Sequence, residues 1–235
     1  MKHVFTIVVA LGLLVPSAFA QYSAVGKVLN SKHDLSSGST SGNIKSTDQT
    51  QVCVFCHVAH QASAANKQEP LWNHTLTATN FSTAYASSTF TALGTGITAI
   101  GQGTAGTATT SHLCLSCHDG TVAVNSLYKF TATIPDSGDL VGGKLTGIGS
   151  LGTDLSSSHP VNFSMDQTTW TKTNPHIVTI NTTTHATTGA VSLPLDSNNK
   201  LQCASCHTSH DNTNTNFLRD SLTGSAICID CHLST

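Results

Sequence analysis

Apolar and polar residues are interspersed along nearly the whole chain without a sustained helical period. The pattern predicts mostly irregular backbone, with a short helical turn at each of four cysteine-containing segments. The segments HIVTINTTT and GAVSLPL are candidates for the two strands of a small hairpin. Residues 82–111 are rich in Gly, Thr and Ser, and we expect a long ordered loop there. The expected fold class is therefore mostly coil, with short helices and minor β structure.

The first twenty residues, MKHVFTIVVALGLLVPSAFA, form a different kind of segment. A basic Lys2, an apolar run and small residues at Ala18 and Ala20 are typical of a cleaved secretory signal. The run is too short to span a bilayer, and no later stretch approaches the roughly 20 apolar residues required. We expect residues 1–20 to be removed and residues 21–235 to be exported as a single domain that does not insert into the membrane.

Charged residues make up only 9% of the chain, compared with about 25% in a typical globular domain. Arg219 is the only arginine and there is no basic patch, so nucleic acid is not an expected partner. Small polar residues are abundant instead of charged residues. Such a surface is either a low-complexity coil or a surface that packs against copies of itself, because a low net charge does little to prevent association.

The eight cysteines are the most informative residues. In an exported chain eight cysteines favour four disulfides by default, but here each pair has the spacing C-x-x-C and is followed directly by histidine. The motifs CVFCH, CLSCH, CASCH and CIDCH contain Cys53, Cys56 and His57; Cys114, Cys117 and His118; Cys203, Cys206 and His207; and Cys228, Cys231 and His232. The motifs are irregularly separated, unlike a structural zinc site, and a thioredoxin-like site would need only one.

The chemistry of c-type haem explains this pattern. Each cysteine sulfur adds to one vinyl group of haem, and the following histidine binds the iron from one side. The sequence therefore predicts four covalently bound haem c groups, with the four motif histidines as proximal ligands. About 215 residues around four haems are too few for a conventional core, so we expect a stack of the four haems to be the core and the haem-free chain to be unfolded.

Histidine is the expected sixth ligand of the irons. The exported part has a single methionine, Met165, which we interpret as a gap-filling side chain. His60 lies three residues after His57, and His210 lies three after His207. A residue one helical turn from a proximal ligand cannot reach the opposite face of the same haem, so each should bind the iron of a different haem.

Two further histidines complete the expected distal set. His33 precedes the first motif, with Asp34 beside it to orient the ring, and His159 is stiffened by the following Pro160. The expected distal ligands are His33, His60, His159 and His210. Among the remaining histidines of the exported part, His74, which follows Trp72, is a reserve candidate. The other three, His112, His176 and His185, are interpreted as solvent-exposed.

The order of these motifs along the chain is similar to that of a known protein family. KHDLSSGS, VCVFCHVAH, PLWNH, LCLSCHDGTVAV, GTDLSSSHPVNF, QCASCHTSH and CIDCH follow one another along most of the chain. The chain resembles the multihaem c-type cytochromes with doubled C-x-x-C-H motifs, most of all the OmcE-type tetrahaem cytochromes that polymerise into extracellular filaments. The resemblance implies bis-histidine haems stacked along the filament, with distal ligands at the four positions above. It also implies that one distal ligand comes from the neighbouring subunit, for which His60 is the candidate.

The expected function is electron conduction by hopping between haems, without enzymatic activity. The expected partners are other copies of the chain, redox proteins or extracellular electron acceptors, and the expected location is the cell surface or outside. Because the fourth motif lies near the C-terminus, we expect its haem at one end of the chain of haems, where His60 of the next subunit would complete it. A monomeric periplasmic electron shuttle is the alternative, and a multihaem reductase is a third possibility that would need an iron with a free face.

Overall fold

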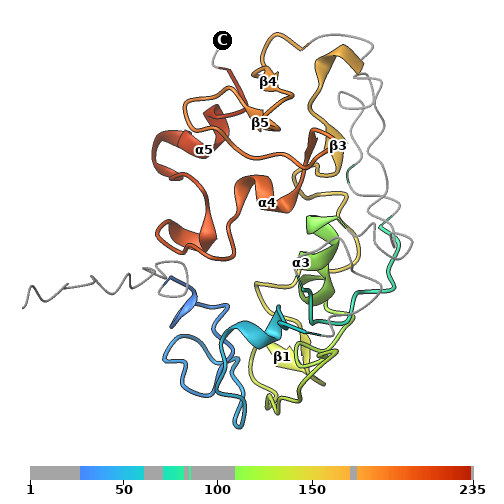
Figure 1. Cartoon of the computed structure of the whole chain (residues 1–235), viewed down its shortest axis with the longest axis vertical. Helices are drawn as coiled ribbons and strands as arrows, with labels where there is room; N and C mark the ends of the chain where they lie inside the picture. Colours follow the sequence, from blue (N-terminus) through green and yellow to red (C-terminus); the bar gives the residue numbers. More distant parts are fainter. Residues whose placement is uncertain (1–26, 61–70, 82–84, 86–108, 170–173, 234–235) are drawn as a thin grey trace, which may run out of the picture.

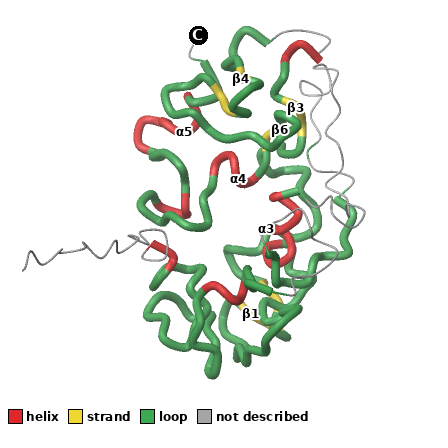
Figure 2. The backbone as a smooth tube through the Cα atoms, viewed as in Figure 1, coloured by secondary structure: helices red, strands yellow, loops and turns green. Residues whose placement is uncertain are grey.

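The computed structural model describes residues 27–60, 71–81, 85, 109–169 and 174–233 (Figure 1). The expected signal segment 1–20 and most of the expected loop 82–111 lie outside these ranges. Loops and turns form most of the described backbone, as the sequence predicts (Figure 2). Within the described ranges, no helix has the length and apolar character that crossing a bilayer requires.

A helical turn accompanies each C-x-x-C-H motif, which confirms the sequence prediction. The four are the 3-10 helix η1 (Cys53–Phe55) and the α-helices α3 (Thr110–His118), α4 (Cys203–Cys206) and α5 (Ala226–Ile229). The other helical turns are the 3-10 helices η3 (Gln167–Thr169), η4 (Thr215–Phe217) and η5 (Thr223–Ser225). Each motif helix is one to three turns long, because the motif itself supplies no apolar face to extend it.

Local side chains begin the two central motif helices. The Thr109 hydroxyl accepts a hydrogen bond from the backbone of His112 at the start of α3. At α4, Gln202 and Ser205 form a reciprocal capping box, in which the Gln202 N–H donates to the Ser205 hydroxyl over 3.0 Å. Both caps satisfy backbone groups that the first turn of a helix leaves unpaired.

The β structure consists of three two-stranded antiparallel pairs. These are β1 (Leu140–Val141) with β2 (Lys144–Leu145), β3 (Phe163–Ser164) with β6 (Lys200–Leu201), and β4 (Ile180–Asn181) with β5 (Ala186–Thr187). The predicted hairpin exists, but its second strand precedes GAVSLPL, which contributes only a bridge between Pro194 and Ala186. The turn closes early because the Asn181 side chain accepts from two following backbone N–H groups and His185 adopts φ 50°.

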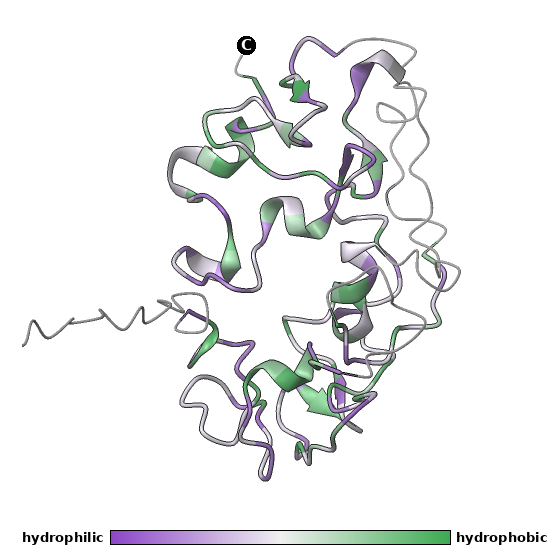
Figure 3. Cartoon of the chain, viewed as in Figure 1, coloured by the Kyte–Doolittle hydropathy of each residue, from purple (hydrophilic) through white to green (hydrophobic). Residues whose placement is uncertain are grey.

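Apolar residues form three separate small clusters in the described part of the chain. The first contains Val54, Phe55, Val124, Ala132, Ile134 and Leu140; the second Phe81, Leu115 and Leu155; the third Phe163, Met165 and Leu201. Met165 therefore has the packing role expected of it. Figure 3 shows apolar residues spread over all parts of the ribbon. The clusters lie beside the motif helices, since Phe55 belongs to η1 and Leu115 to α3.

Candidate haem-binding sites

The four motifs are neighbours in space in the order of the sequence. Viewed with the long axis vertical, η1 (cyan), α3, α4 and α5 follow one another along the molecule (Figure 1). Burial raises the pKa of the Cys117, Cys206 and Cys231 thiols, and a cysteine of a neighbouring or the same motif raises it further: Cys56 at Cys117, and Cys228 at Cys206 and Cys231. Between the second and third motifs, the Cys114 thiol donates a hydrogen bond to the Cys203 sulfur.

A buried polar network holds α3 against α4. The Ser111 hydroxyl accepts from the Cys203 backbone N–H over 3.0 Å and donates to the Gln202 side chain over 2.6 Å. The Gln202 amide in turn donates to Asn162 and Asp196. Gln202 is buried, and each of its side-chain polar atoms has a partner. The network fixes the spacing of the second and third motifs, because an unpaired buried amide would be costly.

The state of the cysteines does not fit disulfides or zinc. All eight are free thiols. Burial raises the pKa of Cys56 to about 11 and that of Cys231 to about 12, so both stay protonated at neutral pH. Zinc binds thiolates at converging ligands, and in the described part of the chain no three His, Cys, Asp or Glu side chains converge in this way. Cys203 differs, because the thiol of Cys114 donates to it and lowers its pKa to about 7.

Three of the four motif histidines face a distant histidine. The ring centroids of His57 and His210 are 6.1 Å apart, and those of His118 and His33 are also 6.1 Å apart. In the third pair, His232 and His159, the distance is 6.4 Å. Two imidazoles on opposite sides of one metal ion, with each nitrogen roughly 2 Å from it, place their centroids roughly 6 Å apart. The three pairs therefore have the spacing that bis-histidine ligation of an iron requires.

Hydrogen bonds to backbone carbonyls select the ring nitrogen that faces the metal. The Nδ1 atoms of His118, His159 and His207 lie 2.6, 3.0 and 2.9 Å from the carbonyl oxygens of Gly149, Pro160 and Asn216. Because a carbonyl only accepts, each Nδ1 carries the proton and Nε2 keeps its lone pair. This is the arrangement that prepares histidine to bind a metal ion.

His33 is held by other residues than expected. Its ring stacks on Phe217 with centroids 4.3 Å apart, and burial lowers the pKa of His33 to about 4, so the ring is neutral. A hydrogen bond with the Ser209 backbone orients it. Asp34 does not take this role, because its carboxylate accepts from the Asn30 N–H and from the N–H and hydroxyl of Ser36. Asp34 closes its own loop, an arrangement typical of aspartate in turns.

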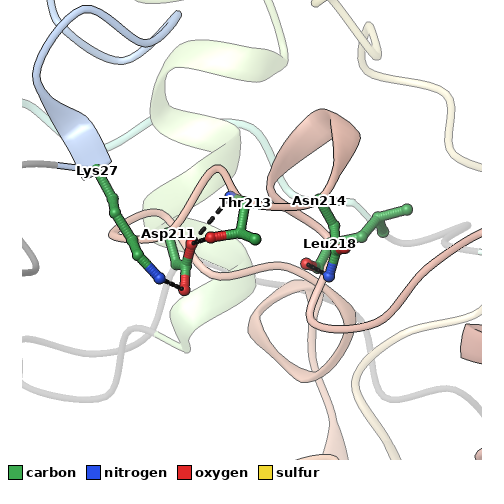
Figure 4. A network of polar contacts seen from close by, with 5 residues as sticks. All are labelled: Lys27, Asp211, Thr213, Asn214 and Leu218. Carbon is green, nitrogen blue, oxygen red and sulfur yellow. Dashed lines mark hydrogen bonds and ion pairs between the residues drawn. The ribbon is translucent and has the colours of Figure 1, made fainter.

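An ion pair at the start of the described chain supports the segment of His210. The Lys27 ammonium lies 2.6 Å from the Asp211 carboxylate, which also accepts from the backbone and hydroxyl of Thr213 (Figure 4). Asn214 closes the same segment by donating to the Leu218 carbonyl over 3.1 Å. The segment that directly follows His210 is therefore held by an ion pair and by local hydrogen bonds.

His60 and His207 remain without an opposing imidazole among the described ring contacts. His60 is exposed, and His207 is exposed with its Nδ1 bonded to Asn216. The expectation for the fourth motif changes, because His232 already faces His159 of the same chain. The single motif histidine that lacks an opposing ring in the described part is His207, of the third motif.

The other four histidines do not face a motif histidine. His112 was expected to be exposed, but this is wrong: its ring is 1% exposed and Nε2 donates to the Thr77 carbonyl over 3.1 Å. The cap at Thr109 starts α3 early, so His112 lies on the buried side of the helix. His74 is equally buried, with its ring nitrogens beside the carbonyls of Thr75 and Ala123, and has a packing role. His176 is exposed as expected, whereas His185 is half-buried and its Nδ1 lies 2.7 Å from the Asn199 side-chain oxygen.

Apolar pockets adjoin the motifs. A pocket of about 190 Å³ beside Cys203, Cys206 and His207 is lined mostly by aliphatic side chains, with Ser158, His159 and Gln202 as its other polar residues. A second pocket, of about 360 Å³, adjoins Cys53 and His57 and is lined by Val54, Val58, Leu71 and Phe130. Porphyrin is a flat apolar ring, so aliphatic walls next to two thiols and an imidazole suit covalently attached haem.

Loss of one distal histidine should expose one iron. In the haem-loaded protein, His33→Ala should leave the iron at His118 five-coordinate, because the opposing imidazole is removed. We expect about a quarter of the haem to become high-spin in the electronic spectrum. The matched control is His176→Ala, which removes an exposed histidine and should leave the spectrum unchanged. A fully low-spin His33→Ala protein would exclude this pairing.

Comparison with known proteins agrees with this chemistry. Residues 196–235, which contain the third and fourth motifs, match the doubled CXXCH motif family. No curated protein matches the chain. The matched family is one of cytochrome-type proteins, which suggests an electron carrier more than a classical enzyme. The motifs indicate covalently bound haem c, and the match supports a multihaem c-type cytochrome involved in electron transfer.

Proposed function

We propose that this protein is a tetrahaem c-type cytochrome that conducts electrons outside the cell as the subunit of a polymerised filament. The observation that carries the proposal is the succession of the four motifs, each a neighbour of the next in space. Haem, once attached, supplies the one-electron chemistry. The chain supplies the spacing between attachment points and the axial ligands, which is the usual contribution of a protein to a bound redox cofactor.

The proposed axial ligands are histidine on both sides. His210 serves the iron at His57, His33 the iron at His118, and His159 the iron at His232, as the ring distances of 6.1, 6.1 and 6.4 Å support. Such irons have no free face for a substrate. Bis-histidine ligation therefore favours electron transfer over a reductase, which needs an open coordination position.

The remaining two histidines support assembly. His60 is an exposed ligand without an iron in its own chain, and His207 needs an opposing ligand. In the proposed filament, His60 of one subunit binds the iron at His207 of the next. The sequence alone favours this bond at the fourth motif, but the pairing of His232 with His159 favours the third. Such a contact joins two different surfaces, so it can repeat from subunit to subunit and produces an open chain when the rotation between neighbours does not close a ring.

Two further properties are consistent with an extracellular filament. The first twenty residues have the pattern of an export signal. Only 9% of the residues are charged, which lowers the repulsion between copies of the chain. A periplasmic shuttle is the second candidate, and it would use the same haems in a monomer. Shuttles commonly dock through a charged patch, and the sequence contains no run of like charges to form one.

Electron microscopy of the native protein, together with its haem content, tests the proposal. We expect four haems per chain, measured from the haem absorbance and the intact mass, and filaments that contain a continuous row of haems. Monodisperse particles with four low-spin haems would favour the shuttle and contradict the filament. A resting high-spin haem in assembled wild-type filaments would instead favour a reductase.

A further inference from the structure

Asp230 is a buried carboxylate inside the fourth haem-attachment motif. It lies between Cys228 and Cys231, and its exposed fraction is 0%. The backbone places it there, because the Asp230 N–H donates to the Ala226 carbonyl over 3.2 Å at the end of α5. On the other side, Gly189 packs so closely that a Cβ atom at this position would collide with the Asp230 backbone. The carboxylate is therefore covered from both directions and shielded from water.

Only one oxygen of this carboxylate has a partner. Oδ1 accepts from the Val191 N–H over 2.7 Å, whereas Oδ2 is buried without a hydrogen-bond partner among the described residues. Burying a carboxylate with an unsatisfied oxygen opposes folding, since the lost hydration is not replaced. Burial of asparagine or of a small apolar residue at this position would cost less free energy. Such an arrangement calls for a role other than stability.

The charge of Asp230 is felt at two attachment cysteines. Asp230 belongs to the same C-x-x-C-H segment as Cys231, and its charge also acts on Cys206 of the third motif, where burial, Cys203, Cys228 and Arg219 have larger effects. Asp230 thus creates a negative potential at the sulfur atoms that would link the third and fourth haems to the chain. In a poorly solvated region this potential is weakly screened, so it extends to the adjoining porphyrins.

A cation lies on the opposite side of Cys206. Arg219, the only arginine, has its backbone N–H 2.9 Å from the Cys206 carbonyl and its Nε 2.8 Å from the Ala204 carbonyl. Its charge lowers the pKa of the Cys206 thiol, while that of Asp230 raises it. The third motif therefore lies between a positive and a negative group. Cys231, in contrast, has the Asp230 carboxylate and no cation among the groups that act on it.

We propose that Asp230 is a buried negative charge that lowers the reduction potentials of the haems at the third and fourth motifs, opposed at the third by Arg219. Reduction of each haem takes one electron into Fe(III) to give Fe(II), and a nearby negative charge stabilises the more positive Fe(III) state. The fourth haem should be lowered more than the third, because Arg219 compensates only at the third. The inference rests on the haem attachment in the proposed function, but not on the filament.

The test is a redox titration of the haem-loaded protein with dithionite as the reductant, followed by haem absorbance. In Asp230→Asn the amide oxygen can still accept from Val191, so the change removes the charge and little else. We expect part of the titration curve, at most the share of two haems, to shift to higher potentials while the rest stays in place. Arg219→Gln should shift a smaller part of the titration curve to lower potentials. Arg219→Lys, which keeps the positive charge, should give the wild-type curve.

Asp154→Asn is the matched control. Asp154 is exposed, and its carboxylate accepts from the Ser156 N–H, a contact that asparagine preserves. Its titration curve should equal that of the wild type. Haem content and the low-spin spectrum of every variant are measured in parallel, so that lost haem is not mistaken for a shifted potential. An unchanged curve for Asp230→Asn with full haem content would overturn the inference, and so would shifts of the same sign for Asp230→Asn and Arg219→Gln.

This test is separate from that of the proposed function. A wild-type protein with fewer than four haems, or one that remains monomeric, contradicts the tetrahaem filament. The opposite shifts of the two charge variants can be measured in either case, provided that the third and fourth motifs carry haem.

Discussion

Protein made without haem attachment should not fold. The described apolar residues form clusters of only six, three and three buried side chains. Ordering the backbone costs about 1–2 kcal/mol per residue, which such small clusters cannot offset. Contacts such as that of His57 with His210 or His33 with His118 join segments far apart in sequence. These contacts between histidine rings stabilise the fold only if an iron binds both rings.

Far-UV circular dichroism, amide NMR dispersion and urea titration measure this effect. The haem-free protein is obtained by producing residues 21–235 in a host compartment without haem attachment, and the haem-loaded protein from the same sequence is the control. We expect random-coil spectra and no cooperative urea transition in the first and a cooperative transition in the second. A dispersed amide spectrum from haem-free protein would show that the polypeptide has a sufficient core of its own.

Haem loss at one motif should have a graded effect. Replacing both cysteines of the third motif by alanine removes the haem attached to α4, while the Ser111 hydroxyl can still bond to Gln202 and to the backbone N–H of residue 203. We expect this variant to be less stable to urea than the wild type but still partly ordered around the other haems. Equal stability of the two proteins would contradict a core made by the haems.

His60→Ala should abolish filaments and leave one haem per subunit high-spin. His60 is exposed and has no imidazole opposite it among the described residues, so its loss should not disturb the subunit. In the assembled state, the iron at His207 would lose its distal ligand, and about a quarter of the haem should change spin state. Electron microscopy reports the filaments and the electronic spectrum reports the iron.

Two comparisons make the His60 experiment specific. His176→Ala removes another exposed histidine and should keep both filaments and spectrum. His33→Ala removes a ligand within the subunit, so it should give a high-spin haem while filaments persist. Added imidazole should return the His60→Ala haem to the low-spin state without restoring filaments. Filaments with a wild-type spectrum in His60→Ala would refute the proposed bond between subunits.

The local chemistry of the chain could be predicted from its sequence. The C-x-x-C-H spacing depends only on five consecutive residues and on the geometry of haem, so the attachment cysteines and proximal histidines needed no knowledge of the fold. The mostly irregular backbone and the helical turns at the motifs were predicted for the same reason, since both depend on local periodicity. Met165 was placed correctly among apolar side chains.

Contacts between distant segments could not be predicted. His112 was expected on the surface and is buried, because the cap at Thr109 turns that side of α3 inward against Thr77. Asp34 was expected to orient His33, but its carboxylate closes its own loop and the Ser209 backbone holds the ring. The second strand of the hairpin begins before the predicted segment, because the side chain of Asn181 closes the turn early.

The sequence by itself determined which residues can attach haem, because covalent attachment requires only neighbours along the chain. The tertiary structure alone decided which histidine opposes which, that His207 rather than His232 lacks an opposing ring, and that Asp230 is buried between two motifs. Each of these depends on segments far apart in sequence that meet only when the chain folds. Their pairing follows from the sum of many packing and hydrogen-bond contacts, and no local pattern encodes that sum.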